Sequence, residues 1–374
     1  MKFLDIKSIL PLFMSILFFS CTGNSGEEGD GGDVSGDLVL KVSKSIIVAD
    51  GEDAAVFTVM KGETDVTDDA KTKIYLGDDI FEGTTFSTST VGEYKFFANY
   101  NDEVTEKQTI KAIEEGSIPV PDDSKPEEFS NFRHRALMVQ STGSWCQFCP
   151  LAIAGIKEYF ENHSDGNAVF VAAHNGDIMA NEYSSKINQW LSITGFPTIT
   201  ASLSSQEIIS ITQSPDLTAE NISSKVSSIS ASECFTNIAA SVSYSEDQKN
   251  LNILANVKVA KAGKYRIQAW VLEDGIYEEQ VNSTGLSGDF NTHNNVLRYS
   301  SSSSATGEAL GNTTESAAGT IEQFACSFEI DKLGVEDLGK CRVVIVTLNG
   351  FSGKFIADNV VECVIGGTAP YEYK

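Results

Sequence analysis

The chain has few basic residues for its length of 374 residues. It contains 27 Lys and Arg against 52 Asp and Glu, which gives a formal net charge of -25 at pH 7. A protein that binds nucleic acid needs positive charge to neutralise backbone phosphates, so this balance argues against a nucleic-acid partner. Hydrophobic residues still make up 41% of the chain, as in globular proteins, and the length suggests two or three domains.

The start of the chain lacks an apolar run long enough to remain as a membrane span. Its apolar segment, Ser8 to Phe19, follows a basic Met-Lys start and ends at Ser20-Cys21. This order is typical of a secretory signal, and the small residue before Cys21 fits the end of a bacterial lipobox. We therefore predict a lipoprotein signal peptide over residues 1–20 and lipid attachment at Cys21. An ordinary signal peptide or an uncleaved anchor is the alternative.

Gly and acidic residues dominate the segment that follows Cys21. Such a composition cannot bury apolar surface, so residues 21–36 are predicted to form a flexible tether. The segment resembles the acidic stretch after the lipid-bearing Cys in surface-exposed lipoproteins of Bacteroidetes-type bacteria. This resemblance implies an exported protein that is held at the outer membrane by its N-terminal lipid and exposed on the cell surface, although a plain spacer would look the same.

Short alternating runs separated by Gly and Asp turns fill residues 37–114. Leu38–Val42 and Ala55–Val59 are examples, and this period of two predicts a small β-sandwich. The stretch Val91–Ala98 resembles the penultimate strand of bacterial immunoglobulin-like modules, which implies a spacer more than a binding surface. Residues 115–130, which are rich in Pro and acids, indicate a linker.

The pattern changes to a mixture of strands and helices in residues 131–232. A buried strand before Gly143, an amphipathic helix over Gln147–His163 and an apolar strand over Ala168–Ala173 predict a β-α-β unit with parallel strands. A helix, two strands and a final helix follow, at Ala180–Ile193, Gly195–Thr200, Ile208–Ile211 and Leu217–Ser230. The order β-α-β-α-β-β-α is that of the thioredoxin fold.

Alternation returns in residues 233–374, which predict a C-terminal β-sandwich. Within it, residues Asn282–Gly311 contain a run of five serines, Ser300–Ser304, and are predicted to form a long surface loop. Such loops can bind partners, but serine of low complexity is more often only mobile. The predicted strands are Ile238–Tyr244, Leu251–Val259, Tyr265–Leu272, Phe324–Ile330, Cys341–Leu348 and Val360–Ile365.

The main chemical signal is the pair Cys146 and Cys149, spaced as Cys-x-x-Cys at a strand-to-helix junction. A lone Cys-x-x-Cys can also be half of a zinc site or a structural bridge. A zinc site needs four ligands, and the sequence has no second Cys-x-x-Cys and no His-x-x-x-His among its four His residues. We therefore predict a redox pair without a metal or another cofactor.

The two cysteines are predicted to have different roles. Cys146 would lie at the N-terminus of the helix, where the dipole and unpaired N–H groups stabilise a thiolate, so it should be the nucleophile. Cys149, one turn further and more buried, would be the resolving thiol that attacks the mixed disulfide.

Pro197, which begins a later strand, is the third predicted catalytic residue. In the thioredoxin superfamily a cis proline faces the cysteines, and it would leave the backbone of Phe196 free to pair with an extended substrate. Trp145 and Phe148 would supply apolar surface around the sulfur. For both, local packing is the alternative.

Within that superfamily, the chain resembles cell-envelope lipoproteins of the outer-membrane-protein family Omp28. The matching stretches are Ser141–Pro150, Trp270–Ile276 and His293–Arg298. The resemblance implies a thioredoxin-fold module followed by a β-sandwich, and an envelope role more than a particular reaction. His293 and Arg298 are either functional or anchors of a loop.

The sequence departs from thioredoxins at Gln140. Thioredoxins carry a buried carboxylate six residues before the first Cys, where it helps to move the proton of the resolving thiol. An amide cannot accept that proton, which counts against efficient disulfide reduction unless water or another base serves.

Four further cysteines lie outside any motif and are predicted to be structural bridges or buried thiols. If Asn349 faces Phe355 in the terminal hairpin, then Cys341 faces Cys363 at a distance that a disulfide can span. Cys234 and Cys326 would then be left as a second pair. A bulge in the second strand would shift this register.

These patterns favour thiol-disulfide exchange with exported proteins or peptides that carry thiols or disulfides. Reductase, oxidase and isomerase activities share the motif and differ in reduction potential, so the direction stays open. The alternative is a surface adhesin or assembly protein without enzymatic activity, in which the bond between Cys146 and Cys149 is only structural.

Overall fold

A computed structural model describes residues 36–43, 45–114, 119–163, 165–245, 248–311 and 315–374. The predicted signal peptide, the predicted lipid site Cys21 and nearly all of the predicted tether lie outside these residues. Strands dominate the described part of the chain, and helices are few. No helix in this part is long and apolar enough to cross a membrane.

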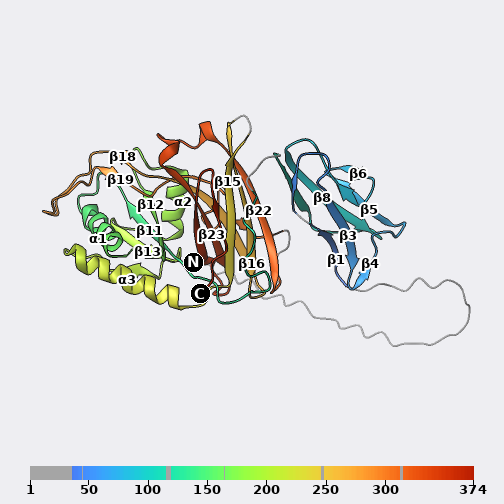
Figure 1. Cartoon of the computed structure of the whole chain (residues 1–374), viewed down its shortest axis with the longest axis horizontal. Helices are drawn as coiled ribbons and strands as arrows, with labels where there is room; N and C mark the ends of the chain where they lie inside the picture. Colours follow the sequence, from blue (N-terminus) through green and yellow to red (C-terminus); the bar gives the residue numbers. More distant parts are fainter. Residues whose placement is uncertain (1–35, 44, 115–118, 164, 246–247, 312–314) are drawn as a thin grey trace, which may run out of the picture. The chain divides into compact units, whose positions relative to one another are not determined.

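Residues 38–113 form the predicted β-sandwich, which is drawn in blue to cyan in Figure 1. One sheet has the order β1-β3-β4 with β7 beside β3, and the other has the order β2-β10-β8-β5-β6 with β9 beside β8. Alternate residues of the strands face a core that includes Phe57 and Phe96, whose ring centroids are 4.6 Å apart. The strands are β1 (Leu38–Val42), β2 (Ile46–Val48), β3 (Ala55–Lys61), β4 (Thr64–Asp65), β5 (Thr72–Leu76), β6 (Asp79–Phe81), β7 (Thr85–Phe86), β8 (Gly92–Tyr100), β9 (Glu103–Val104) and β10 (Gln108–Ile113).

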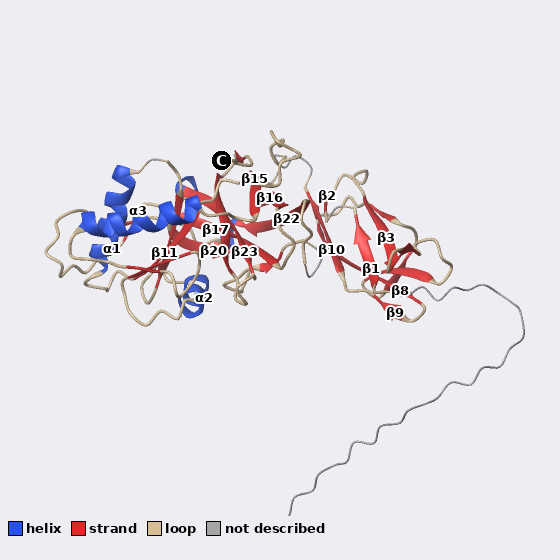
Figure 2. Ribbon diagram, turned by 90° about the horizontal axis from the view of Figure 1, so that it is seen from below, coloured by secondary structure: helices blue, strands red, loops and turns tan. Residues whose placement is uncertain are grey.

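The elements of residues 131–232 follow the predicted order. Strands β11 and β12 are parallel over their whole length, β13 is antiparallel to β11, and β14 is antiparallel to β13. Helices α1 and α3 cover one face of this sheet and α2 covers the other (Figure 2). The elements are β11 (Ala136–Thr142), α1 (Cys149–Asn162), β12 (Ala168–His174), α2 (Glu182–Trp190), β13 (Thr198–Ala201), β14 (Ile208–Ile209) and α3 (Pro215–Ala231).

Local sequence explains where these elements begin. Every residue of β11 and β12 is buried, which agrees with the continuous apolar runs of parallel strands that are covered on both faces. The side chain of Asn181 caps α2 by accepting from two backbone N–H groups. Ser214 caps α3 by accepting from the backbone N–H of Leu217, and Pro215 follows at a position where a missing N–H costs nothing.

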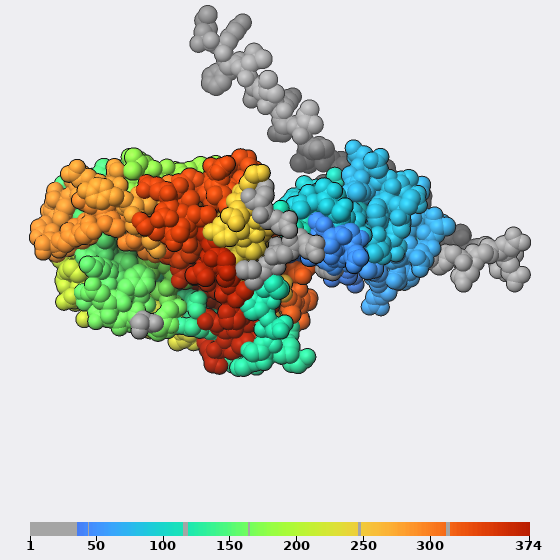
Figure 3. Space-filling view, turned by 45° about the horizontal axis from the view of Figure 1, so that its top comes forward, coloured from blue at the N-terminus to red at the C-terminus, as the bar shows by residue number. Residues whose placement is uncertain are grey.

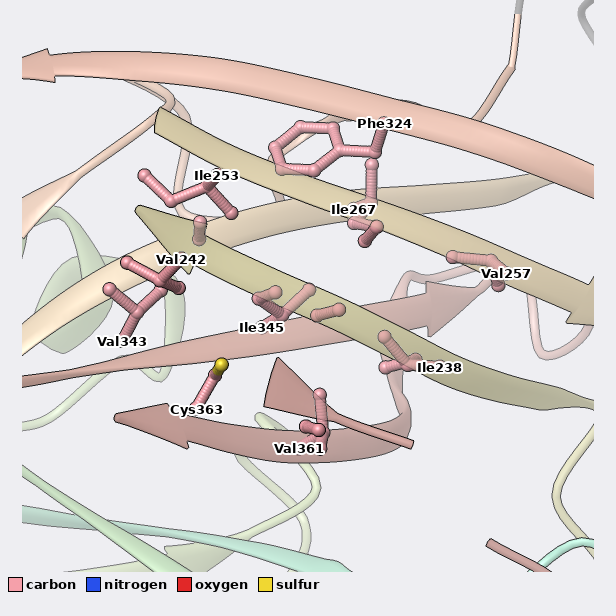
Figure 4. Packing of buried hydrophobic residues seen from close by; sticks show 14 of the residues in the cluster. Ile238, Val242, Ile253, Val257, Ile267, Phe324, Val343, Ile345, Val361 and Cys363 are labelled. Carbon is pink, nitrogen blue, oxygen red and sulfur yellow. The ribbon is translucent and has the colours of Figure 1, made fainter. Parts of the chain in front are cut away.

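The C-terminal part contains the predicted second sandwich. A four-stranded sheet of order β22-β16-β15-β25 packs against β17, β23 and β24 over an apolar core, part of which is shown in Figure 4. The elements are β15 (Thr236–Tyr244), β16 (Asn250–Val259), β17 (Tyr265–Glu273), β18 (Ile276–Tyr277), β19 (Thr292–His293), β20 (Val296–Ser300), β21 (Glu308–Ala309), β22 (Thr320–Glu329), the 3-10 helices Ile330–Lys332 and Leu338–Lys340, β23 (Cys341–Asn349), β24 (Ile356–Val364) and β25 (Thr368–Ala369).

One sheet joins the two segments that the sequence assigns to separate domains. Its strand order is β14-β13-β11-β12-β20-β17-β23-β24, with β21 beside β17, and β12 pairs with β20 at Ala172 and Val296. The predicted boundary between residues 232 and 233 therefore does not separate two sheets. The predicted surface loop, Asn282–Gly311, contains β19, β20 and β21, because the short run that begins at Val296 pairs with strands on both sides.

The described part of the predicted linker is fastened to the C-terminal sandwich. The side chain of Lys258 is fully buried, and its ammonium group pairs with Asp123 and donates to the carbonyl oxygens of Lys125, Pro126 and Glu128 at 2.7 to 3.1 Å. A buried cation requires such partners, so residues 123–128 are a fixed part of the fold and not a free spacer.

The predicted disulfide between Cys341 and Cys363 is wrong. Asn349 pairs with Ile356 and not with Phe355, which shifts the predicted register by one residue. A bulge between Thr347 and Leu348 shifts it by one more, so Cys363 faces Val343. A shift of two residues keeps both sulfurs on the same face but separates them along the strands. Figure 4 shows the side chain of Cys363 in the apolar core.

All four of these cysteines are free thiols, so the second predicted pair, Cys234 with Cys326, is also wrong. Burial raises the thiol pKa of each, to about 12 for Cys341 and about 11 for Cys363. High pKa values leave little thiolate at neutral pH, so these thiols are poorly suited to exchange reactions.

Candidate functional site

A loop between β11 and α1 carries the predicted cysteine pair. Cys146 and Cys149 form a disulfide with their Cα atoms 5.4 Å apart. Helix α1 begins at Cys149, with Phe148 as its N-cap and Pro150 in its first turn, so Cys146 lies just before the helix. Cys149 is fully buried and Cys146 is 4% exposed, and the resolving position predicted from the sequence is therefore the more deeply buried one.

The predicted cis proline is present and lies beside this loop. The peptide bond between Phe196 and Pro197 is cis, directly before β13. The rings of Trp145 and Phe196 meet edge to face with centroids 5.6 Å apart, and the Trp145 indole N–H donates to the carbonyl oxygen of Asn175 at 2.6 Å. Gly143 makes this indole position possible, because a Cβ there would lie 2.7 Å from the indole nitrogen.

The aromatic side chains around the disulfide are open to solvent. Trp145 is 48% exposed and Phe148 is 44% exposed, whereas aromatic residues at core positions such as Phe170 are almost completely buried. Aromatic groups that are exposed close together can form a contact surface, whereas single ones are common on any protein. The structure thus brings together all six residues that the sequence assigns to catalysis or substrate binding: Cys146, Cys149, Pro197, Trp145, Phe148 and Phe196.

A buried pair, His174 and Asp177, is hydrogen-bonded to the cysteine loop. One carboxylate oxygen of Asp177 accepts the backbone N–H of Ser144 at 2.8 Å and lies 2.7 Å from Nδ1 of His174. Burial raises the pKa of Asp177, but the hydrogen bonds from His174 and the backbone lower it by more, so the net shift is downward. The sequence patterns do not point to this pair; its only signal is an Asp three residues after a His that ends a buried strand.

Gln140 and Thr142 of β11 line a cavity of about 530 Å³ next to this pair. His174 and His293 line it from the sheet side and Ile153 from α1. Within the described part of the chain, Gln140 Nε2 and Thr142 Oγ1 are buried and have no hydrogen-bond partner. Gln140 therefore occupies the buried position under α1 that the sequence predicts, and polar atoms remain available around it.

A segment that starts shortly before the predicted surface loop, and overlaps its first residues, crosses the cysteine loop. We call residues 278–291 the strap. The backbone N–H of Val281 donates to the carbonyl oxygen of Ser144 at 2.8 Å, and that of Ser283 donates to the carbonyl oxygen of Gln147 at 3.0 Å. In the space-filling view, orange atoms from this part of the chain adjoin the green atoms of the region around α1 (Figure 3). Composition alone gave no signal for these contacts.

Gln280 makes the most extensive contact between the strap and the loop. Its side-chain amide nitrogen lies 2.9 Å from the carbonyl oxygen of Cys146, 3.0 Å from that of Ser144 and 3.3 Å from that of Gly143. The side chain is 6% exposed. Gln280 thus holds the backbone around the first cysteine, although it lies 134 to 137 positions further along the sequence.

The two residues singled out by the family resemblance have anchoring contacts. His293 Nε2 lies 3.1 Å from the carbonyl oxygen of Glu278, which fixes one end of the strap. Burial lowers the pKa of His293, and the neighbouring ring of His174, 5.2 Å away, lowers it further. Arg298 pairs with Glu273 at 3.4 Å and donates to the carbonyl oxygen of Gly334. In the described residues, no group of three or more His, Cys, Asp or Glu could hold a metal ion.

Residues 185–369 match the family model described as outer membrane protein Omp28. The match begins after Cys146 and Cys149, within α2, so it covers the strap and most of the C-terminal sandwich but not the disulfide. It supports an association of this chain with the outer membrane. No curated protein matches the chain.

Two solved structures from Porphyromonas gingivalis are similar to parts of the chain. The structure of HBP35 aligns with a TM-score of 0.51 and 17% sequence identity, over 64% of this chain and 77% of HBP35. A domain of the outer membrane lipoprotein Omp28 aligns with a TM-score of 0.22 and 17% identity, over 35% of this chain and 88% of that domain. At this level of identity, the likeness to HBP35 concerns the fold alone.

Proposed function

We propose that residues 131–232 form a thioredoxin-fold domain and that Cys146 and Cys149 exchange disulfides with exported proteins or peptides. The observation that carries the proposal is one juxtaposition. A bonded cysteine pair at the start of α1 lies beside a cis Phe196–Pro197 bond through the contact between Trp145 and Phe196. The element order and the parallel pairing of β11 with β12 support the same fold.

The exchange would proceed in two steps. The Cys146 thiolate, favoured by the N-terminus of α1, attacks one sulfur of a partner disulfide, forms a mixed disulfide and releases the other partner sulfur as a thiolate. Cys149 then loses its proton, and its thiolate attacks the Cys146 sulfur. The bond between Cys146 and Cys149 forms, and the remaining partner sulfur leaves as a thiolate. The partner is reduced by two electrons and the protein is oxidised by two; the reverse sequence oxidises a partner dithiol.

The exposed aromatic surface would select extended, partly unfolded partners. Trp145 and Phe148 offer apolar area next to the disulfide, and the backbone of Phe196 could pair with an extended chain as an added strand. The net charge of -25 at pH 7 does not favour nucleic acid as a partner of the chain.

Turnover of a disulfide-bonded model peptide with dithiothreitol as reductant tests the proposal. Cys146→Ser should abolish the protein-catalysed rate, and Cys149→Ser should accumulate a mixed disulfide through Cys146 that mass spectrometry detects. Cys326→Ser, which removes a free thiol in the C-terminal sandwich, is the matched control and should retain the rate. Full activity in Cys146→Ser would refute the proposal.

We also propose that the protein is exported, lipid-anchored through Cys21 to the outer membrane and exposed at the cell surface. The match to the Omp28 family supports a location at the outer membrane, and the Ser20-Cys21 junction supports lipid attachment at Cys21. Cys21→Ala should lose the lipid and move the protein out of the membrane fraction. A variant that stays in that fraction with the same N-terminal modification would contradict the anchor.

A second candidate function is binding or assembly without catalysis. Gln140 favours it, because an amide under α1 cannot take the proton of Cys149 as a carboxylate would. In that case the wild-type protein would show no turnover above the uncatalysed rate, and its disulfide would resist reduction.

A further inference from the structure

The strap places hydrogen-bond donors against the cysteine loop. The carbonyl oxygens of Gly143, Ser144 and Cys146 each accept one backbone N–H, from Cys146, Val281 and Cys149 respectively, at 2.8 to 3.1 Å. The Gln280 amide nitrogen lies within 2.9 to 3.3 Å of all three oxygens. It has two N–H groups, and each carbonyl oxygen has a second lone pair, so the strap supplies these oxygens with donors that the loop itself lacks.

The orientation of the Gln280 amide is fixed by its surroundings. All four groups around the amide nitrogen are carbonyl oxygens, three from the loop and one from Val281 at 3.1 Å. The opposite orientation would direct an oxygen at these acceptors, which would repel it. The amide oxygen points away and, among the described residues, has no hydrogen-bond partner. The positive end of the amide dipole therefore faces the loop of Cys146.

We propose that Gln280 is a positioning residue that stabilises the thiolate of Cys146 and makes the pair more oxidising. The inference rests on the proposed thiol-disulfide exchange. A carbonyl oxygen near a sulfur destabilises negative charge on that sulfur, and a hydrogen bond to the oxygen weakens this destabilisation. The positive end of the Gln280 amide dipole stabilises the thiolate further, because the low dielectric of a buried site weakens screening. Stabilising the thiolate stabilises the reduced form, which raises the reduction potential.

The strap also restricts where a partner can bind. The carbonyl oxygens of Ser144 and Gln147 already accept from the backbone of Val281 and Ser283, so an incoming strand would compete with the strap for these two acceptors. Val281, whose backbone N–H bonds to Ser144, is itself 48% exposed.

The test is the equilibrium between the protein dithiol and a glutathione redox buffer, read by quantifying the bond between Cys146 and Cys149. Gln280→Met keeps the volume of the side chain and removes its donors. We expect the equilibrium to shift about tenfold toward the protein disulfide, which corresponds to a potential lower by about 30 mV. The pH dependence of Cys146 alkylation should move to higher pH in the same variant. Gln206→Met, which makes the same replacement at an exposed site, is the control and should match the wild type.

A second variant covers the case in which Gln280→Met does not fold. Gln280→Glu keeps size and polarity but turns an acceptor toward the loop, so the shift should have the same sign and be larger. Folded Gln280 variants with wild-type equilibrium constants would overturn the inference and leave the exchange proposal intact. A wild-type pair that does not equilibrate with glutathione would instead overturn the proposed function.

Discussion

Buried polar groups near the two ends of β11 differ in how completely they are hydrogen-bonded. At its start, Asp358 and Asn359 of β24 are nearly fully satisfied: Asp358 accepts from the backbone of Phe235 and the side chains of Thr236 and Asn349. Asn359 donates to the carbonyl oxygens of Arg133 and Thr236. At the other end, the described residues leave three buried polar atoms without a hydrogen-bond partner: Gln140 Nε2, Thr142 Oγ1 and Gln280 Oε1.

This difference separates a structural network from a candidate site. Asp358 is the residue that the bulge in β24 inserts, and its contacts tie β24 to β15, while those of Asn359 tie β24 to the start of β11. Saturated networks of this kind rigidify a fold. The cysteine end combines unused polar atoms, exposed aromatic rings and a bonded cysteine pair, and such exceptions to polar satisfaction are frequent at functional sites.

The largest effect is expected from breaking the network. Asp358→Ala should lower the free energy of unfolding by about 3 kcal/mol, because it leaves buried donors of Phe235 and Asn349 without an acceptor. Urea denaturation measures this value. The exposed Asp331→Ala serves as the control and should change the stability by less than about 0.5 kcal/mol. A similar loss of stability in both variants would show that the buried hydrogen bonds of Asp358 contribute no more than an exposed carboxylate does.

A pH-dependent effect of similar size is expected at His134, which also lies at the start of β11. Burial lowers its pKa from 6.5 to about 4. Between these values the unfolded chain binds a proton that the folded chain does not, so stability should fall as the pH falls from 6.5 to 4, by up to about 3 kcal/mol. His134→Gln should remove this part of the slope in urea denaturation series. An unchanged slope would contradict the burial of a neutral imidazole.

The smallest effect compares one threonine from each end. Thr142→Val removes a buried hydroxyl that has no partner among the described residues, so stability should stay within about 1 kcal/mol of the wild type or increase. Thr236→Val removes a buried hydroxyl that donates to Asp358 and should cost about 1 to 3 kcal/mol. Equal costs at the two positions would remove the proposed distinction between the ends.

Local signals predicted the cysteine end well. The spacing of Cys146 and Cys149, the proline just before a strand and the apolar runs of β11 and β12 each depend on a few neighbouring residues. The structure places them as expected, with a disulfide, a cis bond at Pro197 and parallel strands. Propensity and periodicity carry this kind of information because turns and helix starts are set within a few residues.

Contacts between distant segments could not be predicted in the same way. The register of β23 and β24 depends on a turn one residue longer than expected and on the insertion of Asp358, which no local pattern announces. The contacts of Gln280 and Lys258 could not be predicted either, since a polar residue in a loop or strand gives no sign that it will be buried against carbonyl oxygens. Long-range pairing of this type decides which residues complete the candidate site.

The central claim is that the bond between Cys146 and Cys149 is a working exchange site, and its reduction potential tests this most directly. The protein lacking the signal peptide and Cys21 would be equilibrated with defined ratios of dithiothreitol or glutathione, and the thiols of the pair quantified by alkylation and mass spectrometry. We expect a potential between about -270 and -120 mV, the range of thiol-disulfide oxidoreductases. A potential below about -300 mV, typical of structural disulfides, would contradict the account.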